Sequence, residues 1–234
     1  LRRIDPSLKV DGSTRYALAE TAQGSAPVME LFREGRGVAT VLLWVVNFMN
    51  LLNLYFLSSW LPTIATSAGM STSTAVMVGT TLQVGGVLGT LLMGPVIDRI
   101  GFFKVLVPCF ALAALSIALI GQPGIGLPLL FLVVTVTGFC IIGGQPAVNA
   151  LAATYYPTAL RSTGLGWSLG IGRWGSIAGP VLGGLLIQFE WSNSEIFLAM
   201  AVPTVIAALM LFLFAHTGGT ASAPAARVDG DIVH

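Results

Sequence analysis

The sequence has 234 residues, of which 55% are hydrophobic and only 9% are charged, and its net charge is +1. Soluble domains carry about 25% charged residues, so a chain this apolar is not expected to fold as a water-soluble domain. An integral membrane protein fits the composition, and nothing in the charge balance predicts a nucleic acid partner.

Residues 1–37 are predicted to form a polar linker on the cytoplasmic side. Within it, the segment PVMELFREG (27–35) is typical of a short amphipathic helix that lies before the first membrane span. The chain starts at Leu1 with LRRIDPSLKVDG, which resembles neither a signal peptide nor a transit peptide. We therefore expect that the sequence begins inside a loop of a longer protein.

Six apolar runs follow, and each is long enough to cross a bilayer, which needs about 20 residues. The runs cover residues 38–62, 74–97, 102–121, 127–152, 164–188 and 194–216. They are too long for barrel strands, and open strands are excluded from lipid, so the sequence predicts an all-α membrane protein with six transmembrane helices. Residues 217–234 are small and polar, which predicts a disordered cytoplasmic tail.

The cations orient these spans. Ten of the eleven lie before the first span, in the connections after the second and fourth, or in the tail; they are Arg2, Arg3, Lys9, Arg15, Arg33, Arg36, Arg99, Lys104, Arg161 and Arg227. The opposite connections contain no Lys or Arg. By the positive-inside rule, both termini are expected in the cytoplasm, and the expected location is a bacterial inner membrane.

The connection after the second span carries a motif. It reads GPVIDRIGFFK (94–104), which is G-x-x-x-D-R-x-G followed by a cation, and its motif residues are Gly94, Asp98, Arg99 and Gly101. This pattern resembles the cytoplasmic loop motif of the major facilitator superfamily of secondary transporters. The resemblance implies that Asp98 caps or pairs with a neighbouring helix end and that Arg99 pairs with an acidic residue.

A second stretch, YYPTALRSTGLGWSLGIGRWGSIAGP (155–180), contains Arg161 and is similar to the C-terminal half of the same superfamily. Together with LYFLSSWLPT (54–63), it resembles the aromatic acid:proton symporter branch. The resemblance implies alternating-access transport of a small aromatic carboxylate with a proton as coupling ion. The family has two six-helix halves, so the resemblance also implies a missing N-terminal half as partner.

Arg173 lies inside the fifth span, where a charge costs about 2.5–3.5 kcal/mol on insertion scales. None of the six predicted spans contains an Asp or Glu at this depth; Glu195 lies at the outer end of the sixth span. A guanidinium can hold a carboxylate through two hydrogen bonds, so Arg173 is a candidate to bind an anionic substrate. An ion pair with the missing half and bonding to backbone carbonyls are the alternatives.

Other polar side chains share this depth. Asn47, Asn50 and Asn53 are spaced by three on the first span, and Gln83 lies in the middle of the second. They are predicted to line the substrate cavity, with hydrogen bonding between helices as the alternative. Trp174 is a candidate wall for an aromatic ring.

Two further patterns concern helix geometry. Gln145 and Asn149 flank Pro146 on the fourth span, which predicts a bend whose amides either line the inner path or satisfy freed backbone groups. Glycines spaced by four predict faces where helices approach closely, with easier bending as the alternative. On the fifth span, one such face is formed by Gly175, Gly179 and Gly183, and a similar face is continued by Gly166 and Gly170. On the second span, the pattern is repeated by Gly85 and Gly89.

Other functional classes find less support. The sequence has no metal-ligand cluster, no nucleophile with a nearby base and no P-loop, so we expect neither an enzyme nor a bound cofactor. Cys109 and Cys140 lie in apolar runs and suggest packing. The expected partners are the lipid bilayer and a small anionic substrate. The alternative functions are a carrier of a sugar or another organic anion, and a half-size membrane protein that does not transport.

Overall fold

A computed structural model describes residues 28–217, and the predictions made for residues 1–27 and 218–234 lie outside that range. The described chain forms a short 3-10 helix and six α-helices, without strands, so the predicted all-helical fold is confirmed. The elements are η1 (Val28–Phe32), α1 (Gly37–Ser67), α2 (Thr72–Ile100), α3 (Phe102–Ile120), α4 (Leu127–Tyr155), α5 (Thr158–Gln188) and α6 (Asn193–Thr217).

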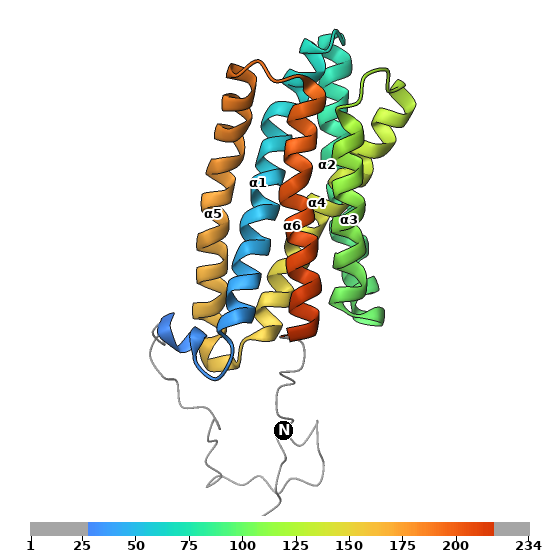
Figure 1. The fold of residues 1–234 in the computed structure, drawn as a ribbon. Helices are drawn as coiled ribbons and strands as arrows, with labels where there is room; N and C mark the ends of the chain where they lie inside the picture. Colours follow the sequence, from blue (N-terminus) through green and yellow to red (C-terminus); the bar gives the residue numbers. More distant parts are fainter. Residues whose placement is uncertain (1–27, 218–234) are drawn as a thin grey trace, which may run out of the picture.

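The six helices run up and down the bundle in alternation (Figure 1). The described chain therefore begins and ends at the same end of the bundle. We call this the cationic end, because it also carries the described cations other than Arg173, namely Arg33, Arg36, Arg99, Lys104 and Arg161. The opposite, distal end carries the connections 68–71, 121–126 and 189–192. The alternation of cationic and neutral connections predicted from the sequence is thus present in the fold.

The strongest contacts pair α1 with α5, α2 with α4, and α3 with α6. Two of these pairs touch backbone to backbone. A Cβ atom on Gly175 would lie 2.2 Å from the carbonyl oxygen of Phe48, and one on Gly85 would lie 2.2 Å from that of Thr135 on α4. Neither space admits a side chain, so the close approach predicted from the glycine spacing is confirmed.

Gly166 and Gly170 differ from this pattern. A Cβ atom on either would meet nothing within 4 Å, and both residues are exposed on α5. They were predicted to continue a similar close-contact face, but among residues 28–217 that close contact is not present. The physical reason is the 100° step of an α-helix, which places residues 166 and 170 far around the axis from residue 175.

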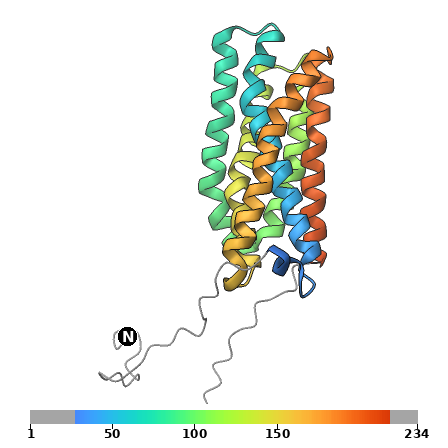
Figure 2. The same cartoon turned by 90° about the vertical axis from the view of Figure 1, so that its left-hand side faces the viewer.

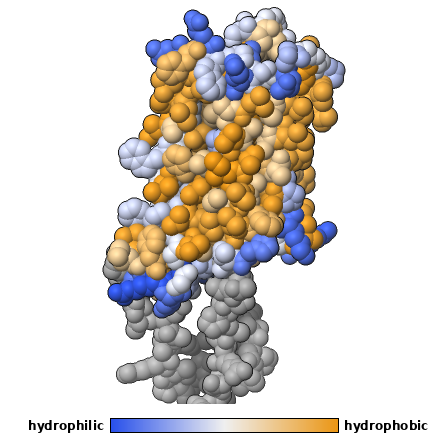
Figure 3. Space-filling model, in the orientation of Figure 1, coloured by the Kyte–Doolittle hydropathy of each residue, from blue (hydrophilic) through white to orange (hydrophobic). Residues whose placement is uncertain are grey.

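On the face shown in Figure 3, the middle of the bundle is apolar and the two ends are more polar. Five of the six α-helices are long and apolar enough to cross a membrane. The exception is α5, which is as long as α1 but contains many glycines and two arginines. Along one side α5 packs on α1, and its other side faces outward (Figure 2).

The helix ends differ from the predicted ones in two places. The second span was predicted to end at Ile97, but α2 continues to Ile100, so Asp98 and Arg99 lie in its last turn rather than in a loop. Only Gly101, with a φ of 91°, separates α2 from α3. The fifth span begins six residues before its predicted start, which places Arg161 in the first turn of α5. Polar residues at helix ends carry no hydropathy signal, and hydropathy alone therefore underestimates helix length.

The segment predicted as an amphipathic helix is the 3-10 helix η1, with Leu31 fully buried against the bundle. A chain of hydrogen bonds connects it to α1 and to Tyr156, the residue that follows α4. The Tyr156 hydroxyl donates to Thr40 Oγ1 over 3.3 Å, and the Thr40 hydroxyl donates to the Leu31 carbonyl over 3.1 Å. All three residues are buried, so water does not compete for these hydrogen bonds, and the bonds hold η1 against the cationic end of the bundle.

Replacing Thr40 by Val tests this tether. The change keeps the side-chain shape but leaves the Tyr156 hydroxyl and the Leu31 carbonyl buried without a partner, which costs about 1–3 kcal/mol. We expect a lower thermal unfolding midpoint in detergent. Thr66→Val is the matched control on α1, because Thr66 is exposed and its hydroxyl bonds only the Thr63 carbonyl of its own helix. Equal unfolding midpoints for the two variants would show that the hydrogen bonds of Thr40 do not stabilise the protein.

Candidate functional site

Arg173 lies at mid-length on α5, about 22 Å from the start of that helix. Its side chain is exposed on the bundle surface, and its Nη1 donates to the Tyr55 hydroxyl of α1 over 3.4 Å. Within residues 28–217 it makes no ion pair and no bond to a backbone carbonyl. Of the three predicted roles, backbone bonding is therefore not observed, and the guanidinium keeps most of its donors free.

Trp174 is also exposed on α5, with 67% of its surface accessible. It borders an open hollow of about 530 Å³ that runs along this helix past Gly166, Trp167 and Gly170. Because the two glycines have no side chains, the indole rings of Trp167 and Trp174 stand at the sides of this hollow. The aromatic surface predicted beside Arg173 is thus present, and contact between Trp174 and a ligand stays a prediction.

The three asparagines of α1 are placed differently. Asn47, Asn50 and Asn53 are at most 1% exposed and lie inside the bundle, so in this conformation they do not face an open cavity. Asn53 Nδ2 donates to the Met49 carbonyl of its own helix over 3.4 Å. Hydrogen bonding within the protein, the alternative weighed for these residues, is what the structure shows. Contact with substrate stays a prediction for Asn47, Asn50 and Asn53.

Asn47 and Asn50 join a cluster of amides that links three helices. Asn47 Nδ2 donates to Ser168 Oγ of α5 over 2.8 Å and to Asn149 Oδ1 of α4 over 3.4 Å. Gln145 Nε2 donates to Asn47 Oδ1 over 2.9 Å and to Asn149 Oδ1 over 3.2 Å. Asn50 Nδ2 donates to Gln145 Oε1 over 2.6 Å and to the Ile141 carbonyl over 3.2 Å. We call Asn47, Asn50, Gln145, Asn149 and Ser168 the amide cluster.

Gln83 is exposed on α2, about 16 Å from the distal start of that helix. It lines a shallow cavity of about 280 Å³ between α1 and α2, together with Ser58 and Thr80. The structure therefore does not bring Gln83 into the amide cluster. Its predicted depth is close to that of Arg173, but its contact with a substrate stays a prediction.

The motif residues gather at the cationic end. Gly94 and Asp98 line a small cavity of about 210 Å³ between the ends of α2 and α4. Within the described residues, Asp98 and Arg99 make no hydrogen bond or ion pair, so the pairing predicted for them stays a prediction. Gly101 takes a positive φ that favours glycine, which explains this residue of the motif. Arg161 is exposed on α5.

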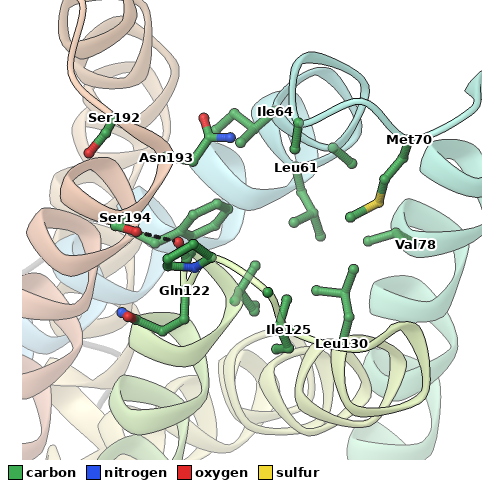
Figure 4. Close-up of a pocket in the computed structure, with 17 residues that line it drawn as sticks. Leu61, Ile64, Met70, Val78, Gln122, Ile125, Leu130, Ser192, Asn193 and Ser194 are labelled. Atoms are coloured by element: carbon green, nitrogen blue, oxygen red, sulfur yellow. Dashed lines mark hydrogen bonds between the residues drawn. The ribbon is translucent and has the colours of Figure 1, made fainter.

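Another cavity, of about 480 Å³, opens at the distal end (Figure 4). Its walls are apolar side chains such as Leu61, Val78 and Leu130, and Gln122 and Asn193 lie at its polar rim. The residues that line it include no Lys or Arg. A carboxylate would find no counter-charge there, so this cavity does not replace the site predicted around Arg173.

Two members of the site were not predicted. Tyr55, the partner of Arg173, lies eight residues after Asn47, and that helical spacing places it on the same face of α1. Ser168 lies five residues before Arg173 and is one of three serines on α5. The spacing from Asn47 was a usable signal for Tyr55, whereas the sequence of α5 does not distinguish Ser168 from the other two serines.

Comparison with known proteins identifies the family. Residues 43–230 match the Major Facilitator Superfamily. The gallate transporter of Pseudomonas putida is 36% identical over 204 residues, which cover 87% of this chain and 45% of that protein. The 4-hydroxybenzoate transporter PcaK of Acinetobacter baylyi is 34% identical over 229 residues, which cover 94% of this chain and 50% of that protein. The benzoate transport protein of the same species is 35% identical over 191 residues, which cover 82% of this chain and 41% of that protein.

The chain thus spans about half the length of the curated relatives it matches. These relatives are named as transporters of aromatic acids, so the predicted resemblance to that branch is confirmed. The family match covers most of the chain, including α1 to α6, and the six-helix bundle agrees with it. The chain belongs to the major facilitator superfamily.

Proposed function

We propose that this chain is the C-terminal half of a carrier that moves a small aromatic carboxylate across a membrane by alternating access, together with a proton. The observation that carries the proposal is Arg173. It is a cation at mid-length of the bundle, exposed on α5, with a tyrosine hydroxyl as its one hydrogen-bond partner among residues 28–217. A positive charge at that depth needs an anion, and a substrate carboxylate supplies one.

The relatives support the same substrate class. Gallate, 4-hydroxybenzoate and benzoate, after which three of them are named, are all carboxylates on a benzene ring. The exposed Trp174 beside Arg173 offers a face on which such a ring can stack. Positive charge and aromatic surface on neighbouring residues of one helix suit a planar anion better than a sugar.

The partner in this proposal is an N-terminal six-helix half. The outward side of α5 exposes large apolar side chains such as Trp167, Trp174 and Ile177, and α2 exposes Val84, Val87 and Leu91. Two halves of such a carrier meet around a substrate site near the membrane midplane. The acids that accept the coupling proton are proposed to lie in that half, since α1 to α6 contain no Asp or Glu in their middle turns.

The proposed location is a bacterial inner membrane, with the cationic end of the bundle in the cytoplasm. The five described cations at that end and the lack of Lys and Arg in the distal connections support this orientation.

Uptake of radiolabelled benzoate and 4-hydroxybenzoate by the whole carrier tests the function. In membrane vesicles with an inward proton gradient, we expect uptake of both acids, and we expect a protonophore to reduce it to the background level. Glucose and succinate serve as a sugar and a non-aromatic anion. Uptake of either in preference to the aromatic acids would refute the substrate class, and full resistance to the protonophore would refute proton coupling.

A further inference from the structure

We propose that the amide cluster contains a binding subsite for a ring hydroxyl of the substrate, with Asn149 as the residue that contacts it. This inference rests on the proposed transport of aromatic carboxylates and adds a second point of recognition to Arg173. It is carried by the hydrogen-bond pattern of the cluster and by the position of the cluster relative to Arg173.

The cluster leaves one amide group without a partner on its accessible side. Asn149 Oδ1 accepts hydrogen bonds from both Asn47 and Gln145, which fixes this atom as the oxygen and its neighbour as the NH₂ group. Asn149 Nδ2 makes no hydrogen bond among the described residues, and Asn149 is half-buried rather than enclosed. The side chain is therefore held in place by its oxygen and presents free N–H donors.

Most other amide groups of the cluster are occupied in holding it together; the exception is Asn50 Oδ1, which is buried without a hydrogen-bond partner among the described residues. Asn47 and Gln145 each use both their amide oxygen and their amide nitrogen within the cluster, and each nitrogen donates twice. Asn50 is 1% exposed and donates inward to α4. Recognition of a ligand thus falls to Asn149, and the remaining amides position it.

The position fits a hydroxylated benzoate. Asn47, which contacts Asn149, and Tyr55, which contacts Arg173, lie on one face of α1 and are eight residues apart, or about 12 Å along the helix. Leu51 lies between them on the same face; it is apolar and, in this conformation, buried against Gly172 of α5. A benzene ring with a carboxylate and a para hydroxyl, extended by a hydrogen bond of about 2.8 Å at each end, spans a comparable distance.

The two ends differ in charge, which sets the orientation of the ring. Arg173 attracts the carboxylate, and the neutral amide of Asn149 suits the oxygen of a phenol, which accepts a hydrogen bond without bringing a charge. Benzoate lacks that oxygen. The subsite therefore predicts that Asn149 distinguishes 4-hydroxybenzoate from benzoate, while Arg173 serves both.

The test is Asn149→Ala in the whole carrier, with the KM for uptake measured for 4-hydroxybenzoate and for benzoate in the same vesicles. We expect the KM for 4-hydroxybenzoate to rise about five-fold, equivalent to about 1 kcal/mol and typical of one lost hydrogen bond, and the KM for benzoate to stay unchanged. Thr154→Ala is the matched control on α4, because the Thr154 hydroxyl bonds the Leu151 carbonyl of its own helix. It should leave both values unchanged.

Benzoate uptake also reports folding, since a misfolded variant loses it. If Asn149→Ala raised both KM values alike, or neither, the hydroxyl subsite would be refuted while aromatic-acid transport stood. If the unsubstituted carrier moved neither acid, the proposed function itself would fail. The two proposals are thus separated by the behaviour of the unsubstituted protein.

Discussion

Replacing Arg173 by Gln is expected to raise the KM for aromatic carboxylates by about 10- to 100-fold. Hydrogen bonds to a charged group contribute about 1.5–3 kcal/mol, and glutamine supplies neither the charge nor the two-pronged geometry. Arg173→Lys keeps the charge but loses the second parallel hydrogen bond, so its KM should fall between those of the original protein and of Arg173→Gln. Both values come from uptake of labelled benzoate at several concentrations.

The same pair of variants separates the substrate role from an ion pair with the N-terminal half. Loss of an inter-half ion pair would reduce the amount of folded carrier or its maximal rate, because the two halves would fit together less well. Loss of a substrate contact raises KM at a constant amount of protein in the membrane. Unchanged KM values in both variants would exclude Arg173 from substrate binding.

Gly175→Ala is expected to destabilise the bundle by about 1–3 kcal/mol or more. The added methyl group would lie 2.2 Å from the carbonyl oxygen of Phe48. Because that oxygen belongs to a helix backbone, it cannot rotate away from the methyl group as a side chain could. The two helices must then separate along their whole contact. We expect a clearly lower thermal unfolding midpoint in detergent, measured on the purified whole carrier.

Gly184→Ala on the same helix is the matched control. A Cβ atom there would lie 3.4 Å from the Trp60 ring, an ordinary contact distance, and alanine favours a helix over glycine by about 1 kcal/mol. Its midpoint should stay the same or rise. A fall as large as that of Gly175→Ala would mean that any added methyl group on α5 is harmful and that the backbone contact is not the cause.

Much of the fold was predictable because lipid imposes strict rules. A long apolar run in this chain has one stable form, a helix, and the cations mark one end of the bundle, so the number and alternation of helices follow from sequence. The end of α2, just after Asp98, and the start of α5 at Thr158 could not be predicted from the sequence, since polar residues extend a helix without adding hydropathy. Glycine spacing predicted that helices approach closely, but not which helix meets which.

The candidate site was predictable in part. A cation at mid-membrane is so costly that Arg173 stands out without a structure. The sequence singled out the asparagines of α1 but did not predict that they are enclosed in this conformation, because an amide stripe has the same sequence pattern whether it faces a ligand or another helix. The gathering of Asn47, Gln145 and Ser168 depends on packing between segments about 100 residues apart, which helical spacing alone does not encode.

The pairing of α1 with α5, α2 with α4, and α3 with α6 means that each principal contact takes one helix from the first three and one from the last three. The contacts within each set of three helices are fewer than those between the two sets. The two sets therefore pack on each other as the subunits of a domain-swapped dimer do, although they belong to one chain. A cut in the connection 121–126 should leave two pieces that are unstable apart and reassemble when they are produced together.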